Sequence, residues 1–286
     1  MAVSLGAVLG MLALLAFSDA AMEGALNAAQ SFAQGVMPAL APMMILGRLL
    51  PAGRADESAG AALRIRTVLF AWAAGSPAAA QRVLMTPLPP KRLECMLCLT
   101  GVMSPMFFTG TLAKWLQSTA DGRKLLIIHW TGAAVAAALW AWLVPPAKET
   151  QPSVNIPRGA PVELASAIGQ SMQPLLCVMG AMVLFSALAG VGIRAASCVF
   201  PVWMKQHTRL PALLWGVLEI GGGAAAVCRE WAKPHAALSA LCGFGGISLL
   251  IQNMLFLQGV VPARRLAAMR ALHGAVSCAL AVIAFA

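Results

Sequence analysis

Four short motifs interrupt hydrophobic segments of this sequence, and they are the places where its residues could do chemistry. Two of them pair serine with proline, at Ser76-Pro77 and Ser104-Pro105. Serine is a favoured N-cap and proline a favoured first helical residue, so each motif predicts a short helix whose free N–H groups point toward the protein interior. Such helix ends carry about half a positive charge and suit carboxylates or phosphates. The chemistry they indicate is the binding of a small anion.

The other two motifs use glycine, which lets the backbone turn and approach a ligand closely because it has no Cβ. One of them follows Glu219, the only acidic residue deep inside a predicted hydrophobic segment, where a charge costs at least ~2.5 kcal/mol and usually marks function. We expect Glu219 to be a coupling or gating group for a proton or a sodium ion, or to cap a neighbouring helix. The candidate substrate-binding residues at the four motifs are Ser76, Pro77, Ser104, Pro105, Gly221, Gly222, Gly223, Gly245, Gly246, Ser248, Gln252 and Asn253.

A purely structural explanation competes with the functional one at each motif. Glycine and proline are common in membrane helices, where small residues allow close packing. Gln252 and Asn253 could equally hydrogen-bond between helices, and nearby backbone N–H groups could satisfy Glu219. We expect His129 and His273 to lie near the membrane edges, where packing or snorkelling explains them. Four breaks at matched places in two halves of the chain favour a site.

These motifs must be positioned by elements that lie in a membrane. The chain has 286 residues, is 60% hydrophobic with a mean hydropathy of +0.80, and is only 10% charged. A soluble domain carries far more charge. The net charge of +10 is spread over connecting loops, which indicates membrane anchoring and excludes a nucleic-acid surface. Scattered cysteines, with no metal cluster, phosphate loop or nucleophile–base pair, argue against an enzyme and against a cofactor.

Charged and proline-rich breaks divide the sequence into nine hydrophobic segments. Two of them, residues 67–81 and 210–228, are either too short or too interrupted for a straight crossing. We expect both to be re-entrant hairpins. The other seven segments are expected to cross the membrane, and they lie at residues 3–20, 32–50, 95–113, 125–144, 162–190, 236–259 and 265–286.

An internal repeat relates the two halves of the chain. Gln and Pro share the same spacing in residues 34–40 and 170–176, and each stretch is followed by a short interrupted segment, a second interrupted segment and an intact one. Each half then makes three crossings, and this odd number inverts the second half, as in secondary transporters. The predicted organisation is a single membrane domain over residues 1–286, with an extra N-terminal span at 1–22, a first repeat at 23–145 and an inverted second repeat at 160–286.

Loop charges predict the orientation. Lys and Arg are more numerous on the face that holds the N-terminus, whereas the first loop contains Asp19 and Glu23 without a basic residue. The positive-inside rule therefore favours a cytoplasmic N-terminus. The first apolar stretch has no basic region before it, so we expect an uncleaved span instead of a signal peptide.

At these motifs the chain resembles a known family, the sporulation integral membrane proteins of the YlbJ type, also called stage V sporulation protein V. Members carry a nucleoside-recognition gate domain. The matching stretches occur in the family's order and lie at residues 23–24, 36–42, 75–79, 104–111, 216–219 and 244–248, with Gln252, Arg270 and Leu272.

The resemblance implies a fold similar to the core of concentrative nucleoside transporters, with two hairpins and two broken helices. It also implies a protein of endospore-forming bacteria that passes dipicolinic acid from mother cell toward forespore, in the cell membrane or the outer forespore membrane. Dipicolinate is a small aromatic dicarboxylate, which agrees with anion-facing helix ends. A nucleoside-like solute and a non-transporting spore-maturation protein are the alternatives. The expected partners are the solute and the lipid bilayer, with a second copy or other sporulation membrane proteins as further candidates.

Overall fold

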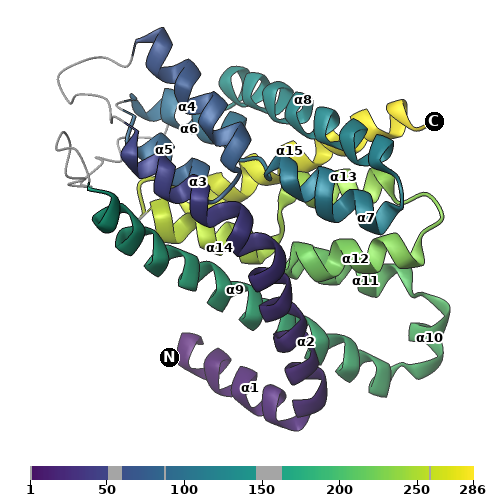
Figure 1. The fold of residues 1–286 in the computed structure, drawn as a ribbon. Coiled ribbons are helices and arrows are strands. Elements are labelled where there is room, and N and C mark those ends of the chain that lie inside the picture. The colour runs from purple at the N-terminus through teal and green to yellow at the C-terminus, as the bar shows by residue number, and fades with distance from the viewer. Residues whose placement is uncertain (1, 51–59, 87, 146–162, 258) are drawn as a thin grey trace.

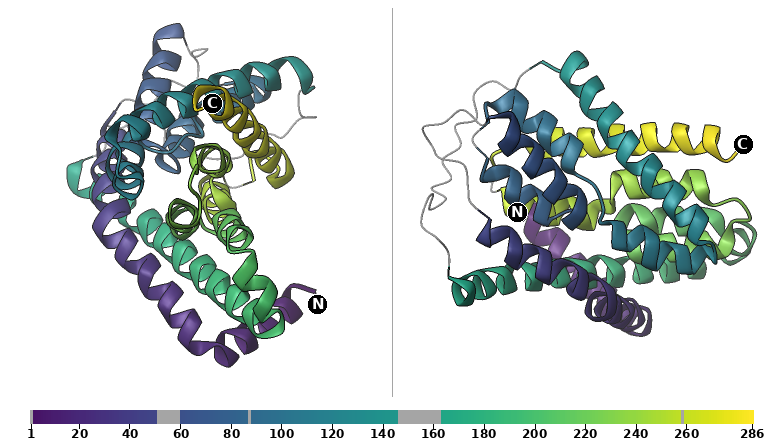
Figure 2. Two further views of the ribbon diagram at one scale, coloured as in Figure 1. Left: turned by 90° about the vertical axis from the view of Figure 1, so that its right-hand side faces the viewer. Right: turned by 45° about the horizontal axis from the view of Figure 1, so that its top comes forward.

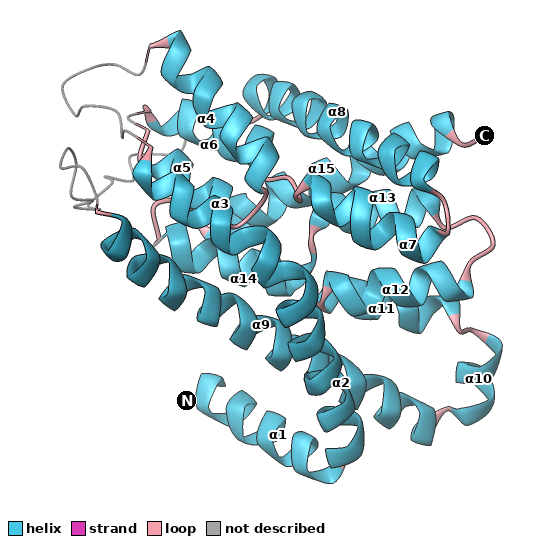
Figure 3. Ribbon diagram, in the orientation of Figure 1, coloured by secondary structure: helices cyan, strands magenta, loops and turns pink. Residues whose placement is uncertain are grey.

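The structure is a computed structural model that describes residues 2–50, 60–86, 88–145, 163–257 and 259–286. Every regular element in these ranges is helical, which confirms the predicted all-α class (Figure 3). Five helices are long and apolar enough to cross a membrane, and they indicate an integral membrane protein. These helices are Ser18–Leu49, Thr119–Leu143, Leu164–Val199, His235–Leu257 and Ala263–Ala284.

The first half contains a long helical stretch, a short helical hairpin, an interrupted segment and an intact helix (Figure 1). Two of its elements, η1 and η2, are π-helical turns. In chain order the elements are α1 (Ala2–Ala16), α2 (Ser18–Ser31), η1 (Phe32–Val36), α3 (Met37–Leu49), α4 (Ala61–Ala74), α5 (Ala78–Leu84), α6 (Pro90–Thr100), η2 (Phe107–Leu112), α7 (Ala113–Leu116) and α8 (Thr119–Leu143).

The second half repeats this order of elements. A long helix is followed by a hairpin, an interrupted segment and an intact helix. In chain order they are α9 (Leu164–Val199), the short α10 (Pro201–Gln206), α11 (Arg209–Leu218), α12 (Ile220–Glu230), α13 (His235–Phe244), α14 (Gly246–Leu257) and α15 (Ala263–Ala284). The junction expected between the two repeats, residues 146–159, lies outside the described residues.

Glycines hold the central helices close together. Helices α8 and α15 lie on one side of the molecule and α2 and α9 on the other, with α13 and α14 between them (Figure 1, Figure 2). A Cβ added to Gly243 of α13 would lie 2.6 Å from the Cα of Gly274 on α15, and Gly132 of α8 faces Ser277 of α15 at similarly short range. Small residues of this kind let membrane helices approach closely. These contacts hold α15 closely against α13 and α8.

The loop predicted after the first hydrophobic segment is wrong. Asp19 and Glu23 lie in α2, which continues through η1 into α3. The stretch is rich in alanine, the strongest helix former, and Gly24 packs against α9, where an added Cβ would lie 2.5 Å from the carbonyl oxygen of Ser186. The first candidate span is therefore Ser18–Leu49, longer than the predicted 32–50, and α1 is a shorter apolar helix before it. Asp19 and Glu23 therefore do not form a loop that would support a cytoplasmic N-terminus.

Candidate functional site

The break between α4 and α5 lies against the break between α6 and η2. Gly75 ends α4 with a φ of 77°, and a Cβ added there would overlap the backbone of Ser104. The N–H of Ser76 donates to the carbonyl oxygen of Val102 at 2.7 Å. Only glycine combines this left-handed conformation with so close an approach. The two non-helical stretches thus satisfy part of each other's backbone, as broken helices within a bilayer require.

Ser76 does not cap α5 as the sequence predicts. Pro77 occupies the N-cap position, because α5 begins one residue later than expected, at Ala78. The Ser76 hydroxyl instead donates to Oδ1 of Asn253 on α14, at 2.6 Å. This hydrogen bond joins the first break to the helix that follows the fourth one.

The turn between α11 and α12 is centred on Glu219, whereas the sequence predicts it at the glycines that follow. Glu219 has an extended backbone, and only 3% of it is exposed. Its two carboxylate oxygens accept hydrogen bonds from the N–H groups of Gly221 and Gly222, each at 2.7 Å. Glu219 is therefore the N-cap of α12, with its charge at the positive end of the helix. The N–H groups expected to face a solute are occupied by this carboxylate.

The glycines after Glu219 serve the packing of the hairpin. Gly223 lies so close to Gly216 of α11 that an added Cβ would overlap the backbone there. A Cβ on Gly222 would lie 2.7 Å from the ring of Trp215. The structure thus places residues 221–223 in the first turns of α12, against α11, and not in the turn itself.

The fourth break lies where the sequence predicts it, between α13 and α14. Gly245 and Gly246 both have positive φ, 83° and 77°, which glycine adopts without strain. A Cβ on Gly246 would lie 3.1 Å from the carbonyl oxygen of Gly216, so this break lies beside the α11–α12 hairpin. Gly243 lies within α13, before the break. In both halves of the chain, the hairpin turn therefore contacts the interrupted segment of its own half.

Arg270 of α15 lies between the second and fourth breaks. It is 3% exposed, and its Nε donates to the carbonyl oxygen of Phe244 at 3.0 Å. Nη1 and Nη2 are buried without a hydrogen-bond partner among the described residues. The sequence connected Arg270 only with the family resemblance, although its charge inside an apolar segment is the signal that marks a functional residue.

A small cavity lies where the first two breaks meet α14 and α15. Its volume is about 10 Å³, roughly the room that one water molecule needs. Its polar lining consists of Ser76, Thr100, Gly101, Asn253, Arg270 and His273. Two of the predicted binding residues, Ser76 and Asn253, are in this lining. The conformation described is closed around its centre, because no solute larger than water fits there.

The remaining predicted residues do not line the cavity. Gln252 donates from Nε2 to the Ser248 hydroxyl at 3.0 Å, so these two buried side chains bind each other along α14. Ser104 and Pro105 lie where the chain turns from the second break into the helical turns that follow, and Ser104 packs on Gly75.

The position predicted for His129 and His273, near the membrane edges, is wrong. Each is 1% exposed, and their ring centroids are 4.5 Å apart. The Met103 N–H donates to Nε2 of His129 at 3.0 Å, and Nε2 of His273 contacts the carbonyl oxygen of His129 at 2.9 Å. Because α8 begins at Thr119, before the predicted segment, His129 falls in the interior of the helix.

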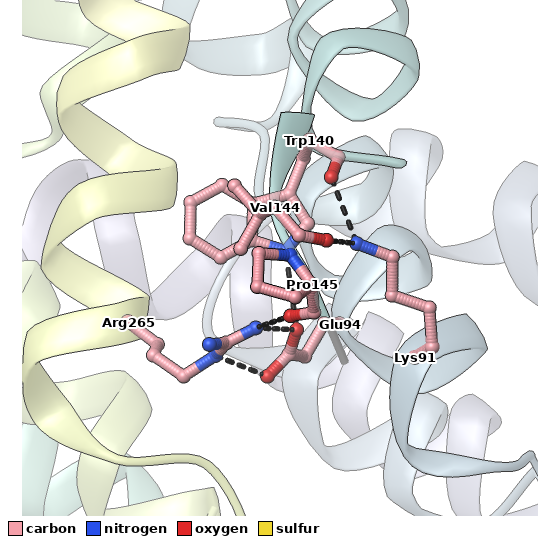
Figure 4. Close-up of polar contacts among 6 residues, drawn as sticks. All are labelled: Lys91, Glu94, Trp140, Val144, Pro145 and Arg265. Carbon is pink, nitrogen blue, oxygen red and sulfur yellow. Dashed lines mark hydrogen bonds and ion pairs between the residues drawn. The ribbon is translucent and has the colours of Figure 1, made fainter. Parts of the chain in front are cut away.

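An ion pair lies next to the cavity, at the beginning of α15. Glu94 of α6 is 2% exposed and accepts hydrogen bonds from Nε and Nη2 of Arg265, both at 2.6 Å, and from Nε1 of Trp140 at 3.2 Å (Figure 4). Arg265 also donates to the carbonyl oxygen of Pro145 at 2.9 Å. The sequence missed this pair, because Glu94 stands just before the predicted segment 95–113. It joins α6, α8 and α15 one turn away from the cavity lining.

Comparisons with known proteins find no matching family model, no similar curated protein and no matching solved structure. The fold and the site therefore define a class by themselves. The class is an all-helical membrane protein with four interrupted segments, two of which line a buried polar cavity.

Proposed function

We propose that this protein is a membrane transporter that moves a small anionic solute through the polar cavity between the first two breaks, α14 and α15. The observation that carries the proposal is this cavity, which Ser76 of the first break and Gly101 of the second break line together with Arg270, whose guanidinium also lies beside Gly245 of the fourth break. Unpaired backbone groups cost several kcal/mol each in a bilayer, so breaks at depth occur where they are buried in protein or line a cavity. Secondary transporters place their sites at discontinuous helices of this kind.

In the proposed architecture, the α4–α5 and α11–α12 hairpins are re-entrant, and about seven helices cross the membrane. The two halves form an inverted repeat. The shared order of elements supports this arrangement, and so does the contact of each hairpin turn with the interrupted segment of its own half. The N-terminus is proposed to be cytoplasmic.

The proposed solute is dipicolinic acid, carried during endospore formation, as the resemblance to the YlbJ-type family implies. Among the described residues, the buried guanidinium of Arg270 has no carboxylate partner, and it lies at the cavity, which favours an anion over a neutral nucleoside-like solute. The proposed location is the bacterial cell membrane or the outer forespore membrane.

Uptake into liposomes tests this function. Liposomes that contain the purified protein should take up more labelled dipicolinate than protein-free liposomes do, under a proton or a sodium gradient. Excess unlabelled dipicolinate should suppress this uptake. If the protein stays helical and takes up no dipicolinate under any gradient, transport of this solute is wrong. A non-transporting spore-maturation protein would give that result.

Two glycines offer a matched pair of variants for this assay. Gly246 and Gly259 both have positive φ, so alanine strains the backbone at either position. Gly246 lies in the fourth break beside the hairpin, whereas Gly259 is exposed with open space around it. We expect Gly246→Ala to abolish uptake and Gly259→Ala to retain it. Equal uptake by both variants would remove the fourth break from the transport path.

A further inference from the structure

We infer that Arg270 binds a single carboxylate group of the solute through its Nη1 and Nη2 edge. This inference rests on the proposed transport function and deepens it, since it names the binding residue and the chemical group that the residue recognises. Four observations support it: the burial of Arg270, its missing partner, its fixed orientation and the glycines on both sides of it.

Arg270 is buried, and its Nη1 and Nη2 have no hydrogen-bond partner among the described residues. Arg270 is 3% exposed, in the interior of a helix that is long and apolar enough to cross a membrane. The ion pairs among the described residues are Asp121 with His235 and Glu94 with Arg265, so neither includes Arg270. A buried charge without a partner is strongly unfavourable. Proteins keep such a charge where a ligand or another group supplies the opposite charge. An anion from outside the chain would be that counter-charge.

The orientation of the guanidinium follows from its one hydrogen bond. Nε donates to the carbonyl oxygen of Phe244, at the end of α13, and this bond holds the plane of the group. The free donors are then Nη1 and Nη2, and Arg270 lines the cavity. Two parallel N–H donors of a guanidinium match the two oxygens of a carboxylate.

Glycines make room for the guanidinium on both sides. A Cβ added to Gly101, in the second break, would lie 2.9 Å from Nη1, and a Cβ added to Gly245, in the fourth break, would overlap Nη2. Side chains at these positions would push the guanidinium away from the cavity. The second and fourth breaks therefore both leave space for the guanidinium of Arg270.

The number of Lys and Arg side chains at the cavity indicates how many carboxylate groups the site can bind. Arg270 is the one Lys or Arg among the residues that line it. One guanidinium pairs with one carboxylate, so a monocarboxylate should bind as well as one end of a dicarboxylate does. Picolinate, the pyridine with a single carboxylate, should compete with dipicolinate for the site.

Equilibrium binding of labelled dipicolinate to the purified protein in detergent tests the inference separately from transport. We expect Arg270→Lys and Arg270→Gln to weaken binding about 10- to 100-fold, the effect of losing charge-assisted hydrogen bonds. Arg264→Gln is the matched control, because Arg264 lies on the same helix but is exposed, and it should bind as the unchanged protein does. Affinity that stays unchanged in both Arg270 variants overturns the inference.

A competition experiment on the unchanged protein keeps the inference testable even where the variants fail to fold. Picolinate should displace labelled dipicolinate, whereas picolinamide, which has nearly the same shape and no charge, should not. Equal displacement by the two compounds, or no binding of dipicolinate at all, overturns the inference. Binding that depends on the carboxylate together with absent uptake in liposomes would contradict the transport function alone.

Discussion

Arg265 and Arg270 lie little more than one turn apart on α15, yet their surroundings are opposite. Arg265 has several partners, with Glu94 across two hydrogen bonds, a carbonyl oxygen and the face of the Trp140 ring (Figure 4). Among the described residues, Arg270 has one carbonyl oxygen as partner, and its Nη1 and Nη2 have none. A buried charge with its own counter-ion holds helices together, whereas a buried charge without one is available to a ligand. The same helix thus carries a paired arginine at its beginning and a buried, unpaired one near its centre.

The largest expected effect comes from removing the counter-ion of Arg265. Glu94→Ala leaves a guanidinium without its carboxylate, which should lower the free energy of unfolding by about 3–5 kcal/mol. The thermal unfolding midpoint of the purified protein in one detergent measures this change. The double variant Glu94→Leu with Arg265→Met should recover most of the loss, because it removes both charges together. A normal midpoint for Glu94→Ala would show that the pair does not hold these helices.

The second prediction compares the two arginines directly. Arg265→Met should lower the unfolding midpoint, because Glu94 is left buried without its partner. Arg270→Met should leave the midpoint unchanged or raise it, because the several kcal/mol gained by removing an unpaired buried charge offset a lost hydrogen bond of about 1.5–3 kcal/mol.

Adding dipicolinate tests whether Arg270, unlike Arg265, binds a ligand. A ligand at 100 times its dissociation constant stabilises the folded protein by about 2.7 kcal/mol, so dipicolinate should raise the midpoint of the unchanged protein and not that of Arg270→Met. If both arginine variants lost stability to the same extent without ligand, the contrast between a structural charge and a binding charge would be wrong.

Glu219 offers a smaller test, since its counterpart is a helix end instead of an arginine. Glu219→Ala should cost about 0.5–2 kcal/mol, the usual loss for an N-cap, and unfolding in detergent measures it. Glu219→Gln should lower stability and leave the pH dependence of uptake unchanged, because both carboxylate oxygens already bind backbone N–H groups. A shifted pH profile would instead make Glu219 a coupling group.

The smallest effect is expected at Ser76. Ser76→Ala removes one hydrogen bond to Asn253, worth about 1 kcal/mol. Ser197→Ala is the control, because the Ser197 hydroxyl donates only to a carbonyl oxygen of its own helix. The unfolding midpoint of Ser76→Ala should lie below that of Ser197→Ala. If both variants lower the midpoint equally, the hydrogen bond between Ser76 and Asn253 does not contribute more to stability than a bond within one helix.

Composition and the placement of glycine and proline were sufficient to predict the helical class and the positions of three of the four breaks. Gly75 and Gly245 lie at turns that their sequence context already indicates, because few other residues adopt positive φ. The exact turn at Glu219 was missed, since one carboxylate that caps α12 moves the turn two residues earlier.

The polar centre was much harder to predict than the breaks. Glu94 and Arg265 stand 171 residues apart, and Arg270 reaches Gly101 and Gly245 only because three helices converge. Local patterns report which residues break a helix, whereas these contacts depend on how helices from both halves pack. Ser76 and Asn253 were predicted as site residues, but their direct hydrogen bond was not, for the same reason.

The small volume of the cavity has a consequence for the kinetics of the proposed transport. A centre with room for about one water molecule cannot conduct solutes as an open pore does. Each dipicolinate would have to wait for the walls to separate and close again, so uptake should saturate with concentration and slow steeply on cooling. Helix motions of this kind occur on microsecond to millisecond timescales, far slower than diffusion through a channel.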